Sequence, residues 1–183
     1  MNSFKKLSTS LPGVLVIEPR VFGDERGFFL ESHNERAFGE LGIAARFVQD
    51  NHSSSRRNVL RGLHYQIKQP QGKLVRAIEG EILDVAVDVR RSSPTFGGWE
   101  AVLLSSENKR MLWIPAGFAH GFHVLSETAQ VLYKATDYYA PEHERTVIWN
   151  DPDLKIDWKV NGEPIVSAKD QRGALLRDAE TFE

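Results

Sequence analysis

A histidine set between two cations is the first feature of this chain that points to chemistry. His64 lies in the stretch VLRGLHYQ, with Arg61 before it and Lys73 after it. Imidazole titrates near neutral pH and is the side chain most often used as a general acid or base. Cations on both sides of such a base favour a substrate that carries negative charge. The competing interpretation is a core histidine whose ring is hydrogen-bonded to a backbone carbonyl, which is common for a lone histidine.

A histidine base usually needs an orienting group on its second ring nitrogen. Two aspartates are candidates for this role: Asp170 in the stretch SAKDQ and Asp84 in the strand-like run GEILDVAVD. Each is also compatible with a turn residue or a solvated carboxylate. Residue types and spacing alone leave both candidates open.

A second histidine follows a glycine-containing loop, PAGFAHGFHVLS. Pro115, Gly117 and His120 form the pattern P-x-G-x-x-H, in which glycine lets the backbone turn tightly enough for the histidine to reach the mouth of a cavity. The pattern resembles the second motif of the cupin jelly-roll family. Metal-binding cupins also carry a first motif with H-x-H followed by a carboxylate, whereas the corresponding place here has His64 alone, in HYQ.

A metal site is not expected from these histidines. A divalent metal in such a site needs about three convergent protein ligands. His120 and His123 are three residues apart, so on one strand their side chains point to opposite faces. We therefore expect His64 to act through proton transfer, if it acts at all.

Tyrosines form a second group of candidates in the stretch VLYKATDYYAPEHER, which contains Tyr133, Tyr138 and Tyr139. A buried tyrosine can donate a proton, or it can contribute apolar packing area with one satisfied hydroxyl group. Composition alone favours the packing role.

The composition limits the class of protein. With 183 residues, of which 41% are hydrophobic and 10% aromatic, the chain is long enough for one domain with a sizeable core, and we expect a single domain over residues 1–183. A formal net charge of −2 argues against nucleic-acid binding through bulk positive charge. The absence of cysteine excludes disulfides and thiolate metal sites. No apolar run reaches membrane-spanning length, so we expect no membrane association and a cytoplasmic location.

Short β-type runs recur along the chain and predict an all-β sandwich or barrel. One helix is expected over residues 34–41, capped by Asn34 and stopped by Gly42. Two hairpins are predicted, one joining residues 73–78 to 81–89 and one joining 99–105 to 111–114. A polar loop is expected over 53–58, irregular structure after Tyr139, and a short helix after Asp170. The remaining predicted strands cover residues 14–18, 28–32, 47–52 and 130–136, with a further strand running out of the loop 115–123.

The run 81–89 alternates strictly, which places four aliphatic side chains on one face of the strand. The opposite face carries Asp84, Ala86 and Asp88. This face is small and acidic, and the sequence predicts that it lies outside a packed core.

Ten motifs in order resemble the dTDP-4-dehydrorhamnose 3,5-epimerase family. They cover residues 14–170 and read VFGDERGFFLES, FVQDNHS, NVLRGLHYQ, QGKLVR, GEILDVAVD, SPTFG, LWIPAGFAHGF, YKATDYYAPEHER, WNDP and VSAKD. The resemblance implies a cupin-type jelly-roll subunit, a homodimer, and no metal or organic cofactor. It implies a dTDP-4-keto-6-deoxy sugar as the substrate, dTDP-4-dehydro-6-deoxy-D-glucose, which is converted to dTDP-4-dehydro-L-rhamnose in dTDP-L-rhamnose biosynthesis.

The resemblance also assigns catalytic roles by motif. His64 would accept the proton from carbon, and Asp170 would orient His64. Lys73 would stabilise the C4 enolate oxygen, where preorganised positive charge is most useful. Tyr133 would return a proton from the opposite face of the sugar, which inversion requires.

The family's substrate-binding positions carry compatible residue types in this chain. Cationic side chains suit the diphosphate, Gln and Asn suit the polar edges of the nucleotide, and Tyr139 matches the position that stacks on thymine. The positions are Arg26, Glu31, Gln49, Asp50, Asn51, Arg61, Lys73, His120, Tyr139, Glu144 and Lys169.

Three alternatives to double epimerisation stay open at this point. A related enzyme would epimerise only C3 or only C5 of a dTDP-4-keto-6-deoxy sugar. A catalytically silent cupin would bind a nucleotide sugar without turnover. A metal-dependent cupin dioxygenase or isomerase is the most distant alternative.

Overall fold

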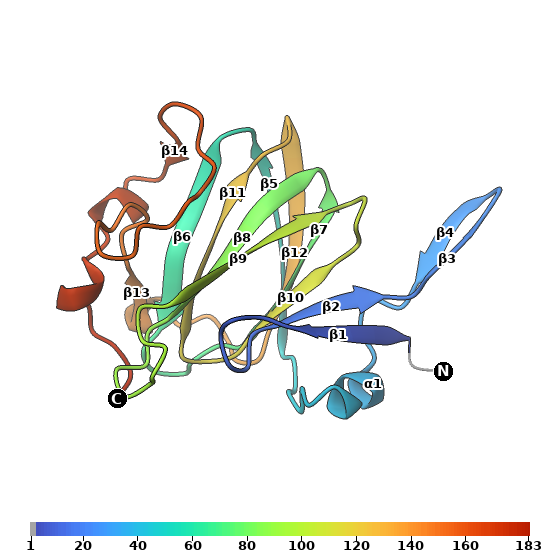
Figure 1. The fold of residues 1–183 in the computed structure, drawn as a ribbon, viewed down its shortest axis with the longest axis horizontal. Coiled ribbons are helices and arrows are strands. Elements are labelled where there is room, and N and C mark those ends of the chain that lie inside the picture. Colours follow the sequence, from blue (N-terminus) through green and yellow to red (C-terminus); the bar gives the residue numbers. More distant parts are fainter. Residues whose placement is uncertain (1–2) are drawn as a thin grey trace.

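Two antiparallel sheets packed face to face form the body of the molecule (Figure 1). The computed structural model describes residues 3–183. The first sheet has the order β1 (Phe4–Ser8), β2 (Leu15–Pro19), β10 (Met111–Ile114), β7 (Lys73–Glu79), β12 (Thr128–Ala135) and β5 (Gln49–Arg56). The second sheet has the order β13 (Glu144–Thr146), β6 (Val59–Gln66), β11 (Phe118–Val124), β8 (Glu81–Asp88) and β9 (Trp99–Ser105), with β14 (Ile165–Val166) parallel to β6. The fold is the all-β jelly roll that the sequence predicts.

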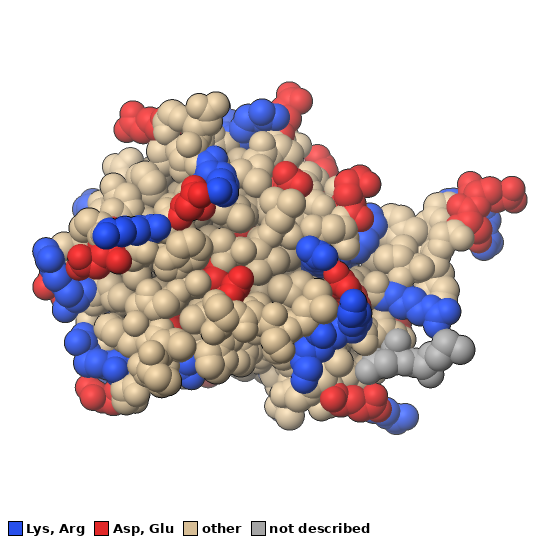
Figure 2. Space-filling model, viewed as in Figure 1, with Lys and Arg blue, Asp and Glu red and all other residues tan. Residues whose placement is uncertain are grey.

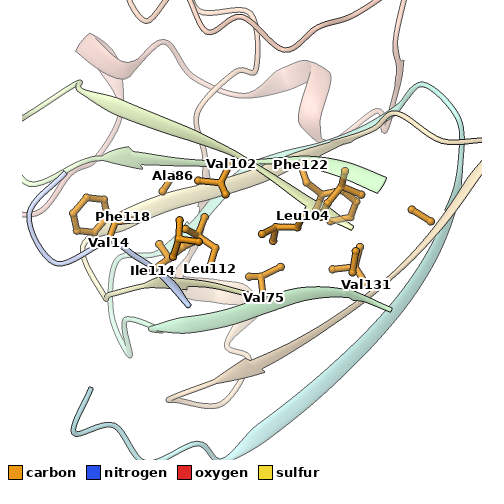
Figure 3. Close-up of a cluster of buried hydrophobic side chains, with 14 of the residues drawn as sticks. Val14, Val75, Ala86, Val102, Leu104, Leu112, Ile114, Phe118, Phe122 and Val131 are labelled. Carbon is orange, nitrogen blue, oxygen red and sulfur yellow. The ribbon is translucent and has the colours of Figure 1, made fainter. Parts of the chain in front are cut away.

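The main core lies between the two sheets (Figure 3). Val75, Leu112 and Val131 face it from the first sheet, and Leu104 and Phe122 face it from the second. These inward side chains alternate with outward ones along each strand, as expected where one face of a strand is buried.

Part of the outer face of each sheet is also covered. Phe38 and Leu41 from the region of helix α1 (Glu35–Glu40) pack with Phe4 and Trp113 on the first sheet. The C-terminal segment covers the second sheet, where Trp158 packs among aliphatic residues of β6 and β8. This segment contains single 3-10 turns at Asp170–Arg172 and Leu176–Asp178, and a third 3-10 turn, Pro141–His143, precedes β13.

The predicted helix is confirmed. The side chain of Asn34 accepts a hydrogen bond from the N–H of Ala37 at 3.1 Å, and Gly42 follows the helix with a φ of 90°. An N-cap of this kind satisfies a backbone donor that the first helical turn leaves free.

Both predicted hairpins are wrong, although the strands themselves are confirmed. β7 and β10 belong to the first sheet, whereas β8 and β9 belong to the second. The chain therefore crosses from one sheet to the other at Gly80, whose φ is 69°, and again between β9 and β10. A strand with one buried face has the same alternation whether it pairs with the next strand or crosses the sandwich, so sequence pattern alone does not separate the two arrangements.

The prediction for the small acidic face of residues 81–89 is also wrong. Ala86 lies in the core between the sheets, and Asp84 and Asp88 are fully buried. Asp88 accepts hydrogen bonds from Arg90, Ser93 and Thr95, and Asp84 pairs with a histidine described below. Buried carboxylates are tolerated where donors compensate for their lost hydration.

The predicted loop over residues 53–58 is largely strand. β5 extends through Arg56, with Ser53 and Ser55 paired to β12. Serine has low β propensity, but strand pairing depends more on neighbours than on intrinsic preference. Only residues 57 and 58 form a turn, with Asn58 at a φ of 66°.

A two-stranded hairpin projects from the body of the molecule (Figure 1). It consists of β3 (Val21–Asp24) and β4 (Gly27–Leu30), so the predicted strand at 28–32 ends two residues early. Its aromatic side chains are largely in solvent, with Phe28 58% and Phe29 67% exposed. Among the described residues, no helix is long and apolar enough to cross a membrane.

Candidate active site

A cavity of about 450 Å³ opens into the jelly roll and is lined from both sheets. Seven of the residues predicted from the sequence line it together, in addition to core and backbone groups. They are Arg61, His64, Lys73, His120, Tyr133, Lys169 and Asp170. Residues separated by more than a hundred positions in the chain are thus brought to one site.

His64 and Asp170 form a close pair at this cavity. The Nε2 atom of His64 lies 2.7 Å from Oδ1 of Asp170, and the other carboxylate oxygen accepts the Gly62 N–H at 3.2 Å. Burial raises the pKa of Asp170, but the hydrogen bonds from His64, Gly62 and Ser167 outweigh it and hold that pKa below its ordinary value. An ionised carboxylate only accepts hydrogen bonds, so Nε2 carries the hydrogen and neutral His64 keeps its lone pair on Nδ1.

Two glycines allow β6 and β11 to approach closely beside this pair. A Cβ atom on Gly62 would lie 2.5 Å from the Cα of Gly121, and one on Gly121 would lie 2.6 Å from the carbonyl oxygen of Arg61. Gly62 also has a φ of 120°, a conformation that side-chain-bearing residues rarely adopt. This close approach sets His64 opposite His120 in the strand register.

His120 has a carboxylate of its own. Its Nε2 atom lies 2.6 Å from Oδ1 of Asp84, and both side chains are buried. The two candidate orienting aspartates are therefore divided between the two histidines: Asp170 contacts His64, and Asp84 contacts His120. The second oxygen of Asp84 is buried and has no hydrogen-bond partner among residues 3–183.

Lys73 reaches the same cavity from the first sheet. Its Nζ atom donates to the carbonyl oxygen of His64 at 3.5 Å. Burial lowers the pKa of Lys73 to about 8, against the opposing pull of the negative charges on Glu144 and Asp84. A cation with so little hydration interacts strongly with any negative charge that develops beside it.

Tyr133 faces the cavity from β12 of the first sheet, whereas His64 faces it from β6 of the second. Burial raises the pKa of Tyr133, the charge of Glu144 raises it further, and Arg61 opposes both effects. Its hydroxyl has no hydrogen-bond partner among the residues that the structure describes. A protonated tyrosine hydroxyl is therefore available on the side of the cavity opposite the histidine.

A second, smaller cavity of about 60 Å³ continues from this site toward Tyr139. Its lining includes His64, Lys73, Tyr133, Tyr139 and Glu144. Glu144 accepts hydrogen bonds from the Tyr139 hydroxyl at 2.8 Å and from Lys169. The ring of Tyr139 is 54% exposed, which leaves room for a planar group to stack on it.

Besides Gln49, four predicted binding residues line neither of these two cavities. Arg26 is at the end of the β3–β4 hairpin and pairs with Asp24. Glu31 accepts a hydrogen bond from Asn34, close to the root of the hairpin. The remaining two lie on β5, where Asp50 pairs with Lys134 and Asn51 accepts from the side chain of Gln49.

Gln49 itself lies at the edge of the Tyr139 region, because its side-chain oxygen accepts the backbone N–H of Tyr139 at 2.9 Å. The Nδ2 group of Asn51 is buried without a hydrogen-bond partner in the described part of the chain.

Gln66 is a site residue that sequence reasoning missed. This buried side chain accepts the N–H of Ala140 and donates to the carbonyl oxygen of Tyr138, so it fixes the backbone on both sides of Tyr139. The signal in the sequence was a polar amide at the end of the strand that also carries Arg61 and His64. Ser167, which accepts the N–H of Asp170, was missed as well and has no comparable signal.

His123 points away from the cavity, as the strand geometry predicts. Its ring nitrogens contact the carbonyl oxygen of Trp158 and the side chain of Asn58. Within residues 3–183, no group of three or more His, Cys, Asp or Glu side chains is arranged to hold a metal ion.

Comparison with known proteins decides the family. The family model described as dTDP-4-dehydrorhamnose 3,5-epimerase matches residues 8–178. This chain belongs to the dTDP-4-dehydrorhamnose 3,5-epimerase family. The enzyme of that name from Pseudomonas aeruginosa is 63% identical over 97% of this chain and 99% of its own length.

Solved structures of epimerases have the same fold. That of dTDP-6-deoxy-D-glucose-3,5-epimerase from Legionella pneumophila, in complex with dTDP-4-keto-L-rhamnose, superposes with a TM-score of 0.94 at 53% identity and covers 96% of this chain and 94% of its own. A 3'-monoepimerase from Streptomyces bikiniensis, in complex with dTDP-quinovose, has a TM-score of 0.87 at 35% identity, covering 92% and 86%. The fold is thus shared between enzymes that invert one carbon and enzymes that invert two.

Proposed function

We propose that this protein inverts C3 and C5 of dTDP-4-dehydro-6-deoxy-D-glucose and forms dTDP-4-dehydro-L-rhamnose. The observation that carries the proposal is the placement of an acid and a base on opposite walls of one cavity. His64 lines the cavity from the second sheet and Tyr133 lines it from the first. Removal of a proton from one face of the sugar and return of a proton to the other face inverts a carbon centre.

The remaining groups fit the chemistry of a 4-keto sugar. The keto group acidifies the protons at C3 and C5, because an enolate at C4 takes the charge left by either proton. Nδ1 of His64 is the basic atom, since Asp170 occupies Nε2. Lys73 stabilises the enolate oxygen, and no metal or organic cofactor takes part in the proposed steps.

The nucleotide binds along Tyr139 and along two cations that line the main cavity, Arg61 and Lys169. Stacking of thymine on the exposed Tyr139 ring adds roughly 0.5–1.5 kcal/mol beyond burial. Arg61 and Lys169 line the main cavity and face the diphosphate, His120 contacts the sugar, and Gln49 and Glu144 position the nucleotide side.

A homodimer is the second part of the proposal. The projecting β3–β4 hairpin carries exposed apolar side chains on its stalk, namely Val21, Phe22, Phe28 and Phe29. Its charged residues gather at the end, as Figure 2 shows. An exposed apolar surface of this kind favours an interface, and a second copy of the chain is its proposed occupant. Arg26 and Glu31, on and beside the hairpin, then complete the partner's site instead of their own.

Subunit mixing tests this arrangement. Arg26→Ala and His64→Asn homodimers should each be impaired. After unfolding and joint refolding, mixed dimers contain one site with both defects and one intact site, so about a quarter of wild-type activity should return. Activity that stays at the level of the separate variants would place Arg26 and His64 in the same subunit's site, or show that no dimer forms.

The activity itself is tested by deuterium exchange. The purified protein is incubated with dTDP-4-dehydro-6-deoxyglucose in D₂O, with and without a chelator, and NMR follows deuterium at C3 and C5. Exchange at both carbons that is insensitive to the chelator supports the double epimerase. Exchange at one carbon would indicate a single-site epimerase, and dTDP-sugar binding without exchange would indicate a binding protein.

Two expectations from the sequence stay predictions. We infer one domain over residues 1–183, because the C-terminal segment packs on the second sheet and supplies Asp170 to the site. We also expect the enzyme to work in the cytoplasm, where a nucleotide sugar would be available to it.

A further inference from the structure

Double epimerisation creates a proton imbalance inside the site, and this inference rests on the proposed function. At the first carbon, His64 gains a proton from the sugar and Tyr133 loses one to it. The sugar is then ready for the second inversion, but the base is protonated and the acid is a phenolate. Before the second carbon can react, His64 must therefore lose a proton and Tyr133 must gain one.

A second carboxylate besides Asp170 lies near the base, in a cavity that Tyr133 also lines. Oε1 of Glu144 lies 4.0 Å from Nδ1 of His64, the atom that receives the proton from carbon. No hydrogen bond within residues 3–183 occupies Oε1, whereas Oε2 is held by Tyr139 and Lys169. The side chain is only 13% exposed, so it is fixed with one oxygen toward the base.

Glu144 also faces the acid. Glu144, His64 and Tyr133 all line the smaller cavity of about 60 Å³. That volume is enough for a bridging water, which needs roughly 10–15 Å³ of this kind of space and two to four polar partners. The Tyr139 and Tyr133 hydroxyls, Lys73 and Glu144 are polar groups of the kind that such a water requires.

We propose that Glu144 is a proton relay that resets His64 and Tyr133 between the two epimerisations. Oε1 takes the proton from Nδ1 of His64 once side-chain motion has closed the 4.0 Å between them to hydrogen-bond distance, and the proton then passes through cavity water to the phenolate oxygen of Tyr133. No electron is transferred and no co-reactant is required, because the proton lost by one group is the proton gained by the other. Hydrogen bonds from Tyr139 and Lys169 keep the carboxylate from turning away.

The pKa of Glu144 suits a group that accepts a proton and releases it again. Burial raises the pKa of Glu144, but Lys169, Tyr139 and the nearby His64 outweigh it, so that pKa lies below its ordinary value. The carboxylate is therefore ionised at rest and holds a proton only briefly. Lys169 and Tyr139 act here as positioning residues.

The test separates the two inversions in time. Glu144→Gln is mixed in excess with dTDP-4-dehydro-6-deoxyglucose in D₂O, and rapid quenching with NMR follows deuterium at each carbon in a single turnover. The first carbon to exchange should do so at nearly the wild-type rate. The second should slow by about 10²-fold or more, the scale of a lost general acid–base step, and the monoepimer should accumulate.

Controls distinguish the relay from damage to the site. Glu142→Gln, two residues earlier and exposed, should behave as wild type at both carbons. Because glutamine keeps an oxygen that can accept from Tyr139 and Lys169, the dissociation constant for dTDP should rise less in Glu144→Gln than in Glu144→Ala. Formate added to Glu144→Ala should restore the second exchange selectively, since a small carboxylate can occupy the vacated space.

Other results would overturn the proposal. Equal slowing at both carbons would mean that Glu144 acts only by binding or orienting the substrate. Unchanged rates at both carbons would mean that the reset follows another path. Absence of any exchange in the wild-type protein would instead reject the proposed function, and the relay with it.

Discussion

His120 lies opposite His64 in the register of β11 and β6, and each of these histidines is bonded through Nε2 to its own buried aspartate. The two pairs differ in what surrounds them. Asp170 has donors on both of its oxygens, whereas one oxygen of Asp84 is buried without a partner. His64 also has the second carboxylate, Glu144, near its free nitrogen. This asymmetry supports the proposal that the His64 pair supplies the base and that the His120 pair contacts the substrate.

Replacement of His64 by Asn should abolish proton exchange at both C3 and C5 while leaving nucleotide binding nearly intact. The expected loss is about 10²–10⁴-fold, because a general base is removed without loss of the nucleotide contacts. Deuterium incorporation measures the exchange, and calorimetry with dTDP measures the binding. His143→Asn, outside the cavity linings, is the matched control. Exchange that persists in the His64 variant would show that another group is the base.

The two aspartates should respond differently to the same change. Asp170→Asn removes the charge that holds the Nε2–H tautomer of His64, so kcat should fall by about 10²-fold or more. Asp84→Asn acts on His120 and, through the lost charge, on the pKa of Lys73; at a pH well below 8, where Lys73 stays charged, it should chiefly raise KM. Both positions are buried, so thermal unfolding must first show that each variant folds. If Asp84→Asn lowered kcat as far as Asp170→Asn does, the division of roles between the two pairs would be wrong.

Much of the site follows from local sequence. The motif RGLHYQ contains both the proposed base, His64, and Gly62, whose close approach to β11 sets the position of that histidine. The helix could be predicted because its cap and its stop are local signals, at Asn34 and Gly42. Such features depend on a few neighbouring residues, and their physical causes lie within the same stretch.

The rest depends on contacts between distant strands. β13 pairs with β6, and this places Glu144 opposite Gln66 and Thr146 opposite His64. Nothing in the spacing of these residues predicts that pairing. The contact of Asp84 with His120 could not be predicted either. Alternation in a strand shows that its two faces differ, but not which face another part of the chain covers. The hairpin predictions failed for the same reason.

Replacement of Tyr133 by Phe should damage inversion more than exchange. The ring and its packing are kept, but the proton for the second face of the sugar is lost. His64 can still remove a proton and return a deuteron to the same face, so deuterium should enter with retention of configuration. NMR coupling constants of the sugar, followed together with deuterium content, measure both quantities. Normal inversion of both carbons would place the acid elsewhere.

Changes at Tyr139 separate stacking from hydrogen bonding. Tyr139→Ala should chiefly raise KM, since the thymine loses its stacking surface. Tyr139→Phe keeps the ring but loses the 2.8 Å hydrogen bond to Glu144, so it should preserve KM better than Ala does. Steady-state kinetics on both variants is the measurement. An unchanged KM with a collapsed kcat in Tyr139→Ala would contradict the stacking role.

The lowered pKa of Lys73 predicts that activity falls at alkaline pH. Its pKa is lowered to about 8 by burial, so the charged form that stabilises the enolate is lost as pH rises through that value. We expect kcat/KM, which reports the free enzyme, to fall above about pH 8.

The sign for stability is opposite to that for activity. Between about pH 8 and the ordinary lysine value the unfolded chain binds more protons at this position than the folded one, so the contribution of Lys73 to stability rises with pH. Deprotonation of Lys73 should therefore lower activity without unfolding the protein.

Lys73→Arg tests this assignment, because arginine stays charged throughout the range. The variant should be slower, since the larger guanidinium fits the enolate oxygen less well, but its alkaline limb should disappear. Lys73→Met should lose activity at every pH. A limb that persists unchanged in Lys73→Arg would assign the titration to another group, and Tyr133, the proposed acid on the same cavity, would be the next candidate.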